Sequence, residues 1–272
     1  MALLAAGRFP LHWAVAHRSF RRYSTYRGAT FAGVFTNTVF GFIQAYVLLA
    51  VLGQRGEVGG FDAADVVTFT FVTQGLLAAV AAFGPFELAD RITSGDVVSD
   101  LYRPFDLQSW WLAQDAGRAG FQLVFRGVPP FAVAALAFDV RLPADAGVWA
   151  AFVLSLGLAV TIAFAWRFAI SLTAFWLIDA RGFVQLTGLV FLFFSGFVVP
   201  LGFFPDGLRA VAQVLPFSAV VQLPVEVFLS KHRAPAELAL VLARQAAWVL
   251  VILVAGRAVL ARAWRKVVVQ GG

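Results

Sequence analysis

The sequence predicts an all-α integral membrane protein with six transmembrane helices and both termini in the cytoplasm. Of the 272 residues, 61% are hydrophobic and only 13% are charged, which is about half the charged share of a soluble globular domain. Six segments are apolar enough to cross the hydrocarbon core, which takes about 20 residues as a helix. Lysine and arginine gather in alternate connections between these segments, and the side that holds more of them is cytoplasmic.

The composition also excludes several classes of function. The chain has no cysteine, so it can form neither a disulfide scaffold nor a cysteine-ligated metal site, and it has no thiol nucleophile. Its three histidines leave little room for a histidine metal site. We interpret the net charge of +6 as membrane anchoring and orientation, with no nucleic-acid partner.

No motif for nucleotide binding or catalysis is present. The phosphate-binding pattern G-x-x-x-x-G-K-[ST] and the zinc pattern H-E-x-x-H are both absent from the sequence. Serines inside apolar segments have no histidine or lysine in a span to activate them. We therefore expect a non-enzymatic protein that binds no cofactor itself and forms one membrane domain over residues 1–272.

The first element is an amphipathic helix predicted over residues 8–27. Aromatic and small residues follow a spacing of 4, 3, 4 and 3, which gathers them on one face of a helix: Phe9, Trp13, Ala16, Phe20 and Tyr23. Three basic residues fall on the opposite face: Arg18, Arg21 and Arg22. This pattern favours a helix that lies flat at the cytoplasmic membrane interface. A soluble helix packed on a partner is the alternative.

The six predicted spans then follow in order, at 31–52, 66–86, 119–138, 147–178, 183–203 and 238–260. Thirteen lysines and arginines lie in the connections on the side of the termini and five on the other side. Three more lie inside apolar segments, and we interpret them as reaching toward the headgroups: Arg126, Arg167 and Arg244. All fifteen acidic residues are expected in connections or at span ends, which argues against a proton-driven carrier.

Small and polar residues mark the first two spans. The first carries one at every fourth position: Gly33, Asn37, Gly41 and Ala45. The second is rich in hydroxyl and amide groups: Thr68, Thr70, Thr73 and Gln74. Such residues ordinarily join membrane helices by close packing and hydrogen bonds. The alternative is that some of them line a translocation path.

The connection at 87–106 predicts two short helices separated by Ser94 and Gly95. Asp96 is expected to cap the second helix, and Pro104 to end it. Its apolar face comprises Val97, Val98, Leu101 and Tyr102. An apolar face with no core of its own to cover indicates a docking partner on the cytoplasmic side.

The segment 204–230 predicts an external re-entrant hairpin. Pro200, Pro205 and Pro216 interrupt the apolar connection 195–237, which contains this segment, after too short a distance to span the membrane again. Helices that dip into the bilayer and return fit the pattern if protein buries their free backbone groups. An amphipathic loop on the membrane surface is the alternative.

These features together resemble the permeases of ABC-2 exporters, which are ATP-binding-cassette transporters, and in particular a six-span subfamily with a separate ATPase. In that family a coupling helix carries an acidic residue followed by Gly, Leu and Pro, as at Glu87, Gly95, Leu101 and Pro104. A Ser-Gly…Pro…Pro…Asn-Pro pattern precedes the last span. The matching residues here are Ser195, Gly196, Pro200, Pro205 and Pro216, but Leu215 replaces the usual Asn.

The resemblance implies a transmembrane subunit that forms the substrate path and couples by alternating access to an ATPase, the site of ATP and Mg²⁺. It further implies a second permease copy or a sister permease in a bacterial plasma membrane. ATPase coupling is expected at Glu87, Asp90, Gly95, Val98, Leu101 and Pro104, and the path at Thr70, Thr73, Gln74, Phe194 and Phe197. A non-transporting scaffold or sensor, or an ion-coupled carrier, would be the alternatives.

Overall fold

The computed structural model describes residues 8–81, 84, 86–102, 105–177, 181–232 and 234–266. Within these residues all the regular secondary structure is helical, apart from a single β-bridge that joins Val58 to Phe61. The α-helices are α2 Arg8–Ser24, α3 Arg27–Leu52, α4 Ala63–Val80, α5 Glu87–Ser94, α6 Val97–Leu101, α7 Leu107–Gln122, α8 Val128–Ala137, α9 Ala146–Ser171, α10 Arg181–Phe194, α11 Asp206–Val214, α12 Gln222–Phe228 and α13 Pro235–Ala263.

Five helical stretches are long and apolar enough to cross a membrane, and they coincide with five of the six predicted spans. They are Arg27–Leu52, Ala63–Val80, Leu107–Ala137, Ala146–Phe175 and Pro235–Ala263. The protein is therefore an all-α, multi-pass membrane protein. The third stretch begins at Leu107, well before the predicted start at 119, because α7 runs without a break through a π-helical turn, Leu123–Gly127, into α8. Pro129 and Pro130 follow the turn after one residue, Val128, and have no N–H to donate to the helix ladder.

The predicted span 183–203 is wrong beyond Phe194. Helix α10 has 14 residues, and Gly196 then takes a left-handed conformation with φ of +84°, which glycine adopts at little cost. The Phe197 backbone N–H donates to the Ser195 hydroxyl over 3.3 Å instead of continuing the helix. After Pro200 the chain forms only a short 3₁₀ turn, Leu201–Phe203.

The proline-broken segment that follows contains two helical pieces, as predicted. Helix α11 and the stretch Pro216–Phe228, which contains a 3₁₀ turn and α12, meet at an angle of 70°. Pro216 lies at the corner, where it starts the 3₁₀ turn. The bend between the two pieces is compatible with a re-entrant hairpin.

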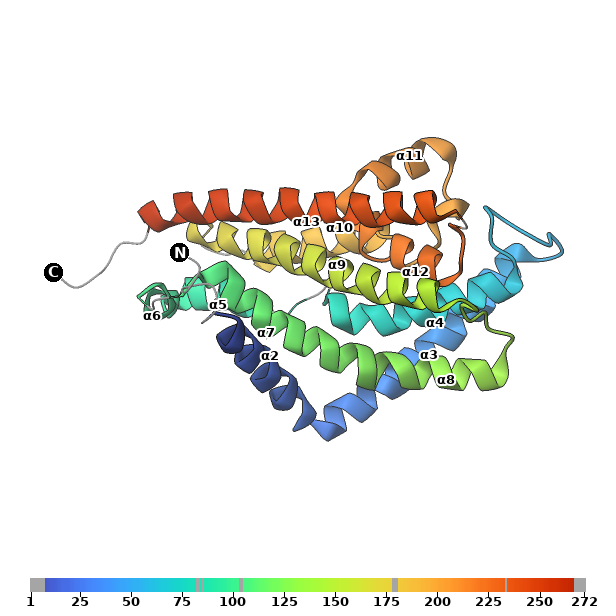
Figure 1. Cartoon of the computed structure of the whole chain (residues 1–272), viewed down its shortest axis with the longest axis horizontal. Coiled ribbons are helices and arrows are strands. Elements are labelled where there is room, and N and C mark those ends of the chain that lie inside the picture. The colour runs from blue at the N-terminus through green and yellow to red at the C-terminus, as the bar shows by residue number, and fades with distance from the viewer. Residues whose placement is uncertain are drawn as a thin grey trace.

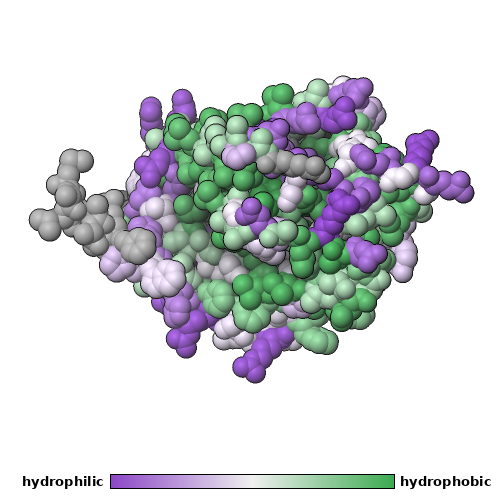
Figure 2. Space-filling view, turned by 45° about the vertical axis from the view of Figure 1, so that its right-hand side comes forward, coloured by the Kyte–Doolittle hydropathy of each residue, from purple (hydrophilic) through white to green (hydrophobic). Residues whose placement is uncertain are grey.

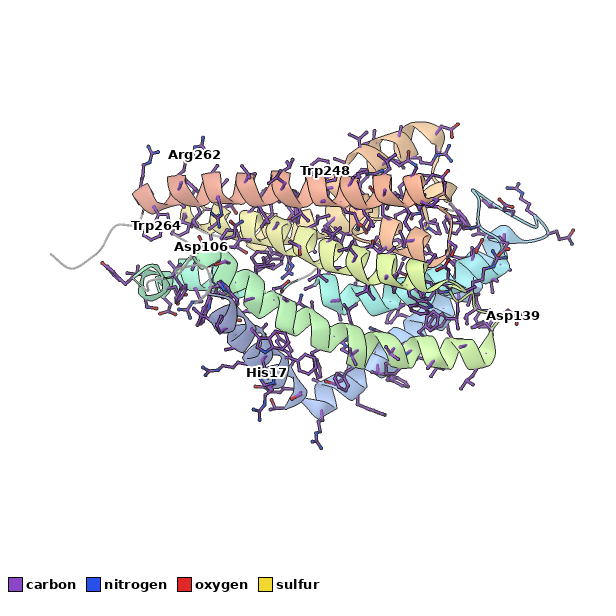
Figure 3. The ribbon with its side chains drawn as sticks, viewed as in Figure 1. His17, Asp106, Asp139, Trp248, Arg262 and Trp264 are labelled. Carbon is purple, nitrogen blue, oxygen red and sulfur yellow. The ribbon has the colours of Figure 1, made fainter. Side chains whose placement is uncertain are left out.

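The long helices lie side by side along the long axis of the molecule, and α3 crosses them obliquely (Figure 1). Helices α5 and α6 lie at one end of the bundle, and α11 and α12 lie toward the other. Asp106 and Trp264 mark the first end, and Asp139 marks the second (Figure 3). We call these the α5 end and the hairpin end.

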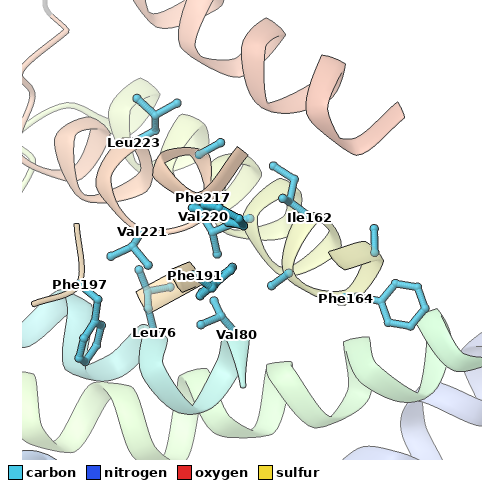
Figure 4. Packing of buried hydrophobic residues seen from close by; sticks show 14 of the residues in the cluster. Leu76, Val80, Ile162, Phe164, Phe191, Phe197, Phe217, Val220, Val221 and Leu223 are labelled. Carbon is cyan, nitrogen blue, oxygen red and sulfur yellow. The ribbon is translucent and has the colours of Figure 1, made fainter. Parts of the chain in front are cut away.

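Helix α4 is the centre of the fold. In its most apolar window 78% of the residues are buried, compared with 22% for α3 and 17% for α13. Its side chains Leu76 and Val80 pack in one hydrophobic cluster with residues of α9, α10 and the bent segment (Figure 4). The small-residue stripe predicted on the first span is buried, and Asn37 donates a hydrogen bond of 3.1 Å to the Gln74 carbonyl oxygen of α4. The packing interpretation of that stripe is confirmed.

The outer faces of the peripheral helices are apolar and exposed. On α3, Phe31 is 76% exposed and Phe35 is 65% exposed, and on α13 Leu240 is 71% exposed. Hydrophobic side chains accordingly cover much of the face of the molecule that Figure 2 shows. A surface of this kind is stable against lipid or another membrane helix, since exposed apolar area on this scale is costly in water.

Candidate functional site

The segment α5–α6 forms a compact helical corner at the α5 end. Gly95 takes a φ of +83° at the end of α5 and lets the chain turn into α6. The Arg91 Nε lies 2.8 Å from an Asp100 carboxylate oxygen, and this ion pair joins the two helices. Arg91 also donates to the Asp96 carbonyl oxygen. The two predicted helices are confirmed, and the ion pair between them is a feature that the pattern did not indicate.

The inner side of this corner is anchored by apolar residues. Leu88, Ala89, Ile92 and Val97 are buried and belong to the same cluster as the core of α4. Because the cluster is continuous, a displacement of the corner must be accommodated by the residues around α4.

Polar residues form the outer side of the corner. Asp90 and Gly95 are exposed, Val98 is half-buried, and Tyr102 is 75% exposed. The expected cap by Asp96 is wrong, because its side chain accepts from the Ser94 hydroxyl over 2.9 Å and caps no helix. Pro104 and the Leu101 side chain lie outside the part of the chain that the structure describes. The described corner thus presents polar groups and one tyrosine outward.

Helix α2 lies along α7 and contacts the same corner. Gly117 of α7 permits a close backbone approach, since a Cβ at Gly117 would lie 2.0 Å from the Ala16 carbonyl oxygen. Phe20 packs on Phe121 with ring centroids 5.5 Å apart, whereas Trp13 is 66% exposed. Part of the predicted apolar face therefore packs on α7, and the rest points away from the chain.

The basic residues of α2 stay on its outer side, as predicted. Arg18, Arg21 and Arg22 are all exposed. Arg22 lies 3.7 Å from the Glu87 carboxylate at the start of α5. An ion pair this exposed contributes only about 0–1 kcal/mol, so it orients α2 against α5 more than it stabilises the fold.

A buried cluster of charges lies where α4, α7 and α9 meet. The Asp115 carboxylate accepts from Arg118 over 2.8 Å with one oxygen and from Arg167 over 2.7 Å with the other. Arg118 also donates to the carbonyl oxygens of Ala78 and Ala79, which lie in the last turn of α4, where carbonyls lack partners within the helix. One arginine thereby connects the charge cluster to the end of the central helix.

This cluster corrects two expectations. Arg167 does not reach for the headgroups, because its ion pair with Asp115 holds it at 9% exposure. Asp115 does not lie in a connection, because α7 already begins at Leu107. The spacing of three residues between Asp115 and Arg118 is typical of an ion pair on one helix and was the signal for this contact. Hydropathy did not predict a span there, because the segment contains several polar residues.

The other two arginines within spans also have neighbours in the protein. Arg244 donates to the Gln213 carbonyl oxygen and to the Ser218 hydroxyl, both over 2.6 Å, so it binds the bent segment and not a headgroup. Arg126 is half-buried and lies against α3, where a Cβ added to Gly33 would be 2.2 Å from its guanidinium carbon.

A pocket opens between α2, α5, α7 and α9, beside the charge cluster, and we call it the α2 pocket. It encloses about 550 Å³, including its open mouth. Its lining combines charged, polar and aromatic residues: Ser19, Arg22, Tyr23, Phe86, Glu87, Leu88, Trp111, Gln114, Asp115, Arg118, Phe164, Arg167, Phe168 and Ser171.

The five predicted path residues are gathered around α4 and the end of α10. Thr70 and Thr73 are fully buried and Gln74 is 4% exposed. Phe197 is 8% exposed and Phe194 is half-buried. Both threonine hydroxyls donate to carbonyl oxygens of their own helix. In this conformation the five side chains are mostly enclosed by the chain itself.

The side-chain amide of Gln44 on α3 links α4 to the segment that follows α10, and Gln44 was not among the predicted site residues. Gln44 accepts from the Gln74 side chain over 3.0 Å, and its own nitrogen donates over 3.0 Å to the carbonyl oxygens of Phe197 and Val198. These carbonyls belong to the irregular segment after α10, so Gln44 supplies donors that the broken helix requires in an apolar environment. Its position beside the small-residue stripe, directly before Ala45, was the signal for this role.

Comparison with known proteins identifies the family. The sequence model of the ABC-2 family transporter protein family matches residues 36–271 of the chain. This range includes α5–α6, the buried charge cluster and Gln44. Helix α2 precedes the match. No curated protein matches the chain. Since the family model covers most of the sequence, the chain belongs to the ABC-2 family and is a transmembrane permease of an ABC transporter.

Proposed function

We propose that the chain is the transmembrane subunit of an ATP-driven exporter in a bacterial plasma membrane, and that it works with a separate ATPase and a second permease, either another copy or a sister chain. Membership of the family implies a partner ATPase in general. In this proposal ATP and Mg²⁺ bind to the partner, and the chain itself holds no cofactor. Its own task is to form the substrate path and to move when the ATPase moves.

The α5–α6 corner is the observation that carries the proposal. It is small and closed by the Arg91–Asp100 ion pair, and its outer groups Asp90 and Tyr102 have solvent access. Its inner residues belong to the core. A short rigid element of this kind can receive a push from a soluble domain and pass it inward without unfolding.

Two routes lead from the corner to the central helix. Leu88 and Ile92 share the hydrophobic cluster of Leu76 and Val80 on α4. Arg118, which is bound to the last turn of α4, lies on α7. Helix α7 packs closely on α2 at Gly117, and Arg22 of α2 lies 3.7 Å from Glu87 of α5. Movement of α5 would therefore be transmitted to α4 through both apolar packing and the charge cluster.

Alternating access would then open the enclosed region around α4 and α10. The path candidates Thr70, Thr73, Gln74, Phe194 and Phe197 would become accessible when these two helices separate. Because Gln44 holds Gln74 and the Phe197 carbonyl oxygen together, its hydrogen bonds would have to rearrange during each cycle.

We assign the coupling contacts to Glu87, Asp90, Gly95, Val98, Leu101 and Pro104.

The experiment is ATP hydrolysis by the permease and its ATPase assembled in nanodiscs. Arg91→Ala removes the ion pair between α5 and α6 and should uncouple hydrolysis from the permease, so that activity changes several-fold relative to the wild-type complex. The control is Arg209→Ala, which removes an exposed ion pair of α11 at the opposite end. Equal hydrolysis in both variants and the wild type would contradict the coupling assignment.

The same preparation addresses the other classes of function. If no ATPase is retained by the chain in mild detergent, a scaffold or sensor that docks a different partner becomes the better proposal. An ion-coupled carrier is disfavoured at Asp115, because both of its carboxylate oxygens are engaged by arginines. Transport that follows a proton gradient without ATP would reverse that conclusion.

A further inference from the structure

We infer that the α2 pocket binds the phosphate of an anionic lipid headgroup. The pocket lies between α2 and the ends of α7 and α9, and its lining includes three arginines and two carboxylates. One positive charge is therefore in excess at the pocket. The inference does not depend on the exporter proposal, since it rests only on the groups that line this pocket.

The arginines differ in how many of their N–H groups have an acceptor in the protein. All three guanidinium nitrogens of Arg118 donate to protein oxygens. Arg167 is 9% exposed and donates to Asp115 through one terminal nitrogen, while its Nε is buried and has no acceptor among the described residues. A buried cation that shares its only carboxylate with a second arginine is under-compensated, and an anion placed beside it would be stabilised.

A second buried donor lies on the α7 wall. The Trp111 Nε1 is buried and likewise has no acceptor among the described residues. Tryptophan N–H groups usually find a partner when they are buried, and an unpaired buried donor is costly. Trp111 and Arg167 lie on two different helices that line one pocket, and each has an unpaired N–H group for which an anion can supply the acceptor.

The remaining walls favour an amphiphile over a free ion. Phe86, Phe164 and Phe168 line the same space as the arginines, and apolar rings do not contribute to binding inorganic phosphate. The exposed Arg22 and the hydroxyl groups of Ser19 and Tyr23 lie on α2. A phosphodiester with an attached glycerol and acyl chain can use both the donors and the rings, at the end of a helical bundle where headgroups lie.

The test is native mass spectrometry of the full chain in detergent, titrated with phosphatidylglycerol or with phosphatidylcholine of the same acyl chains. We expect selective binding of phosphatidylglycerol. Trp111→Phe removes the N–H and keeps an aromatic side chain, so it should weaken phosphatidylglycerol binding about tenfold, the effect of losing one hydrogen bond to a charged acceptor. Trp248→Phe on α13 is the control, because Trp248 lies outside the pocket.

A second pair of variants tests the charge at the mouth. Arg22→Gln should reduce phosphatidylglycerol binding several-fold, whereas Arg21→Gln should not, since Arg21 is exposed on the same helix but does not line the pocket. Equal binding of the two lipids, or equal effects within each pair of variants, would overturn the inference. Displacement of phosphatidylglycerol by millimolar inorganic phosphate would overturn the lipid assignment and make the site one for free phosphate.

Discussion

The crossing of α2 and α7 leads to a prediction that two glycines on one helix can test. A Cβ at Gly117 would lie 2.0 Å from the Ala16 carbonyl oxygen, whereas ordinary contacts begin at 3.4 Å. Helix α2 would have to recede by about 1.4 Å, and the obstacle is backbone that cannot rotate away. Overpacking of this kind costs about 1–3 kcal/mol, against a helix-propensity gain of up to about 1 kcal/mol for Gly→Ala.

Gly120 lies one turn further along α7 and provides the matched control. A Cβ there has a single neighbour, the Phe20 ring, at 4.0 Å. Gly120→Ala should therefore retain the propensity gain and be neutral or slightly stabilising, while Gly117→Ala should be less stable than Gly120→Ala by the overpacking cost of about 1–3 kcal/mol. The assay is the thermal unfolding midpoint of the purified chain in one detergent. Equal midpoints for the two variants, or a more stable Gly117→Ala, would refute the close approach of α2.

Two further substitutions test other close contacts by the same assay. Asp115→Asn removes the negative charge that two buried arginines share, and it should lower the free energy of unfolding by about 3–5 kcal/mol. Asp139 is exposed, so Asp139→Asn should leave the free energy of unfolding almost unchanged. Similar losses in the two variants would argue against the buried cluster. Gly59→Ala places a Cβ 2.2 Å from the Gly202 carbonyl oxygen at a φ of +58° and should cost about 1–3 kcal/mol, whereas Gly56→Ala, with nothing within 4 Å, should be tolerated.

Five spans could be predicted from hydropathy because each is a long apolar helix. The segment at 183–203 shows why a sixth could not. Phe197, Val198 and Val199 are as apolar as α10 itself, so the hydropathy signal continues, but Gly196 and Pro200 change the backbone. Hydropathy indicates whether a segment prefers lipid or water, but it does not indicate the backbone dihedral angles. Here the carbonyl oxygens of Phe197 and Val198 accept hydrogen bonds from Gln44 instead of from a helical N–H.

Only part of the candidate site could be predicted from the sequence, for a related reason. The turn at Gly95 follows from a local rule, since glycine ends helices, although neither helix of the corner begins with a side-chain cap. The ion pairs of Asp115 depend on the packing of α7 against α9, and the pairing of Arg167 with a residue 52 positions away leaves no local pattern. The excess of cations on one side was visible in the sequence, but the burial of Arg118 and Arg167 was not.

Contact between α5–α6 and an ATPase is the claim on which the functional account depends. The chain has no cysteine, so single-cysteine variants report on one position each. Asp90→Cys on the outer side of α5, modified with a photoactivatable maleimide, should crosslink to the ATPase in the assembled complex. Asp206→Cys on α11, whose side chain is 92% exposed, should not. Crosslinking from Asp206→Cys but not from Asp90→Cys would contradict the account.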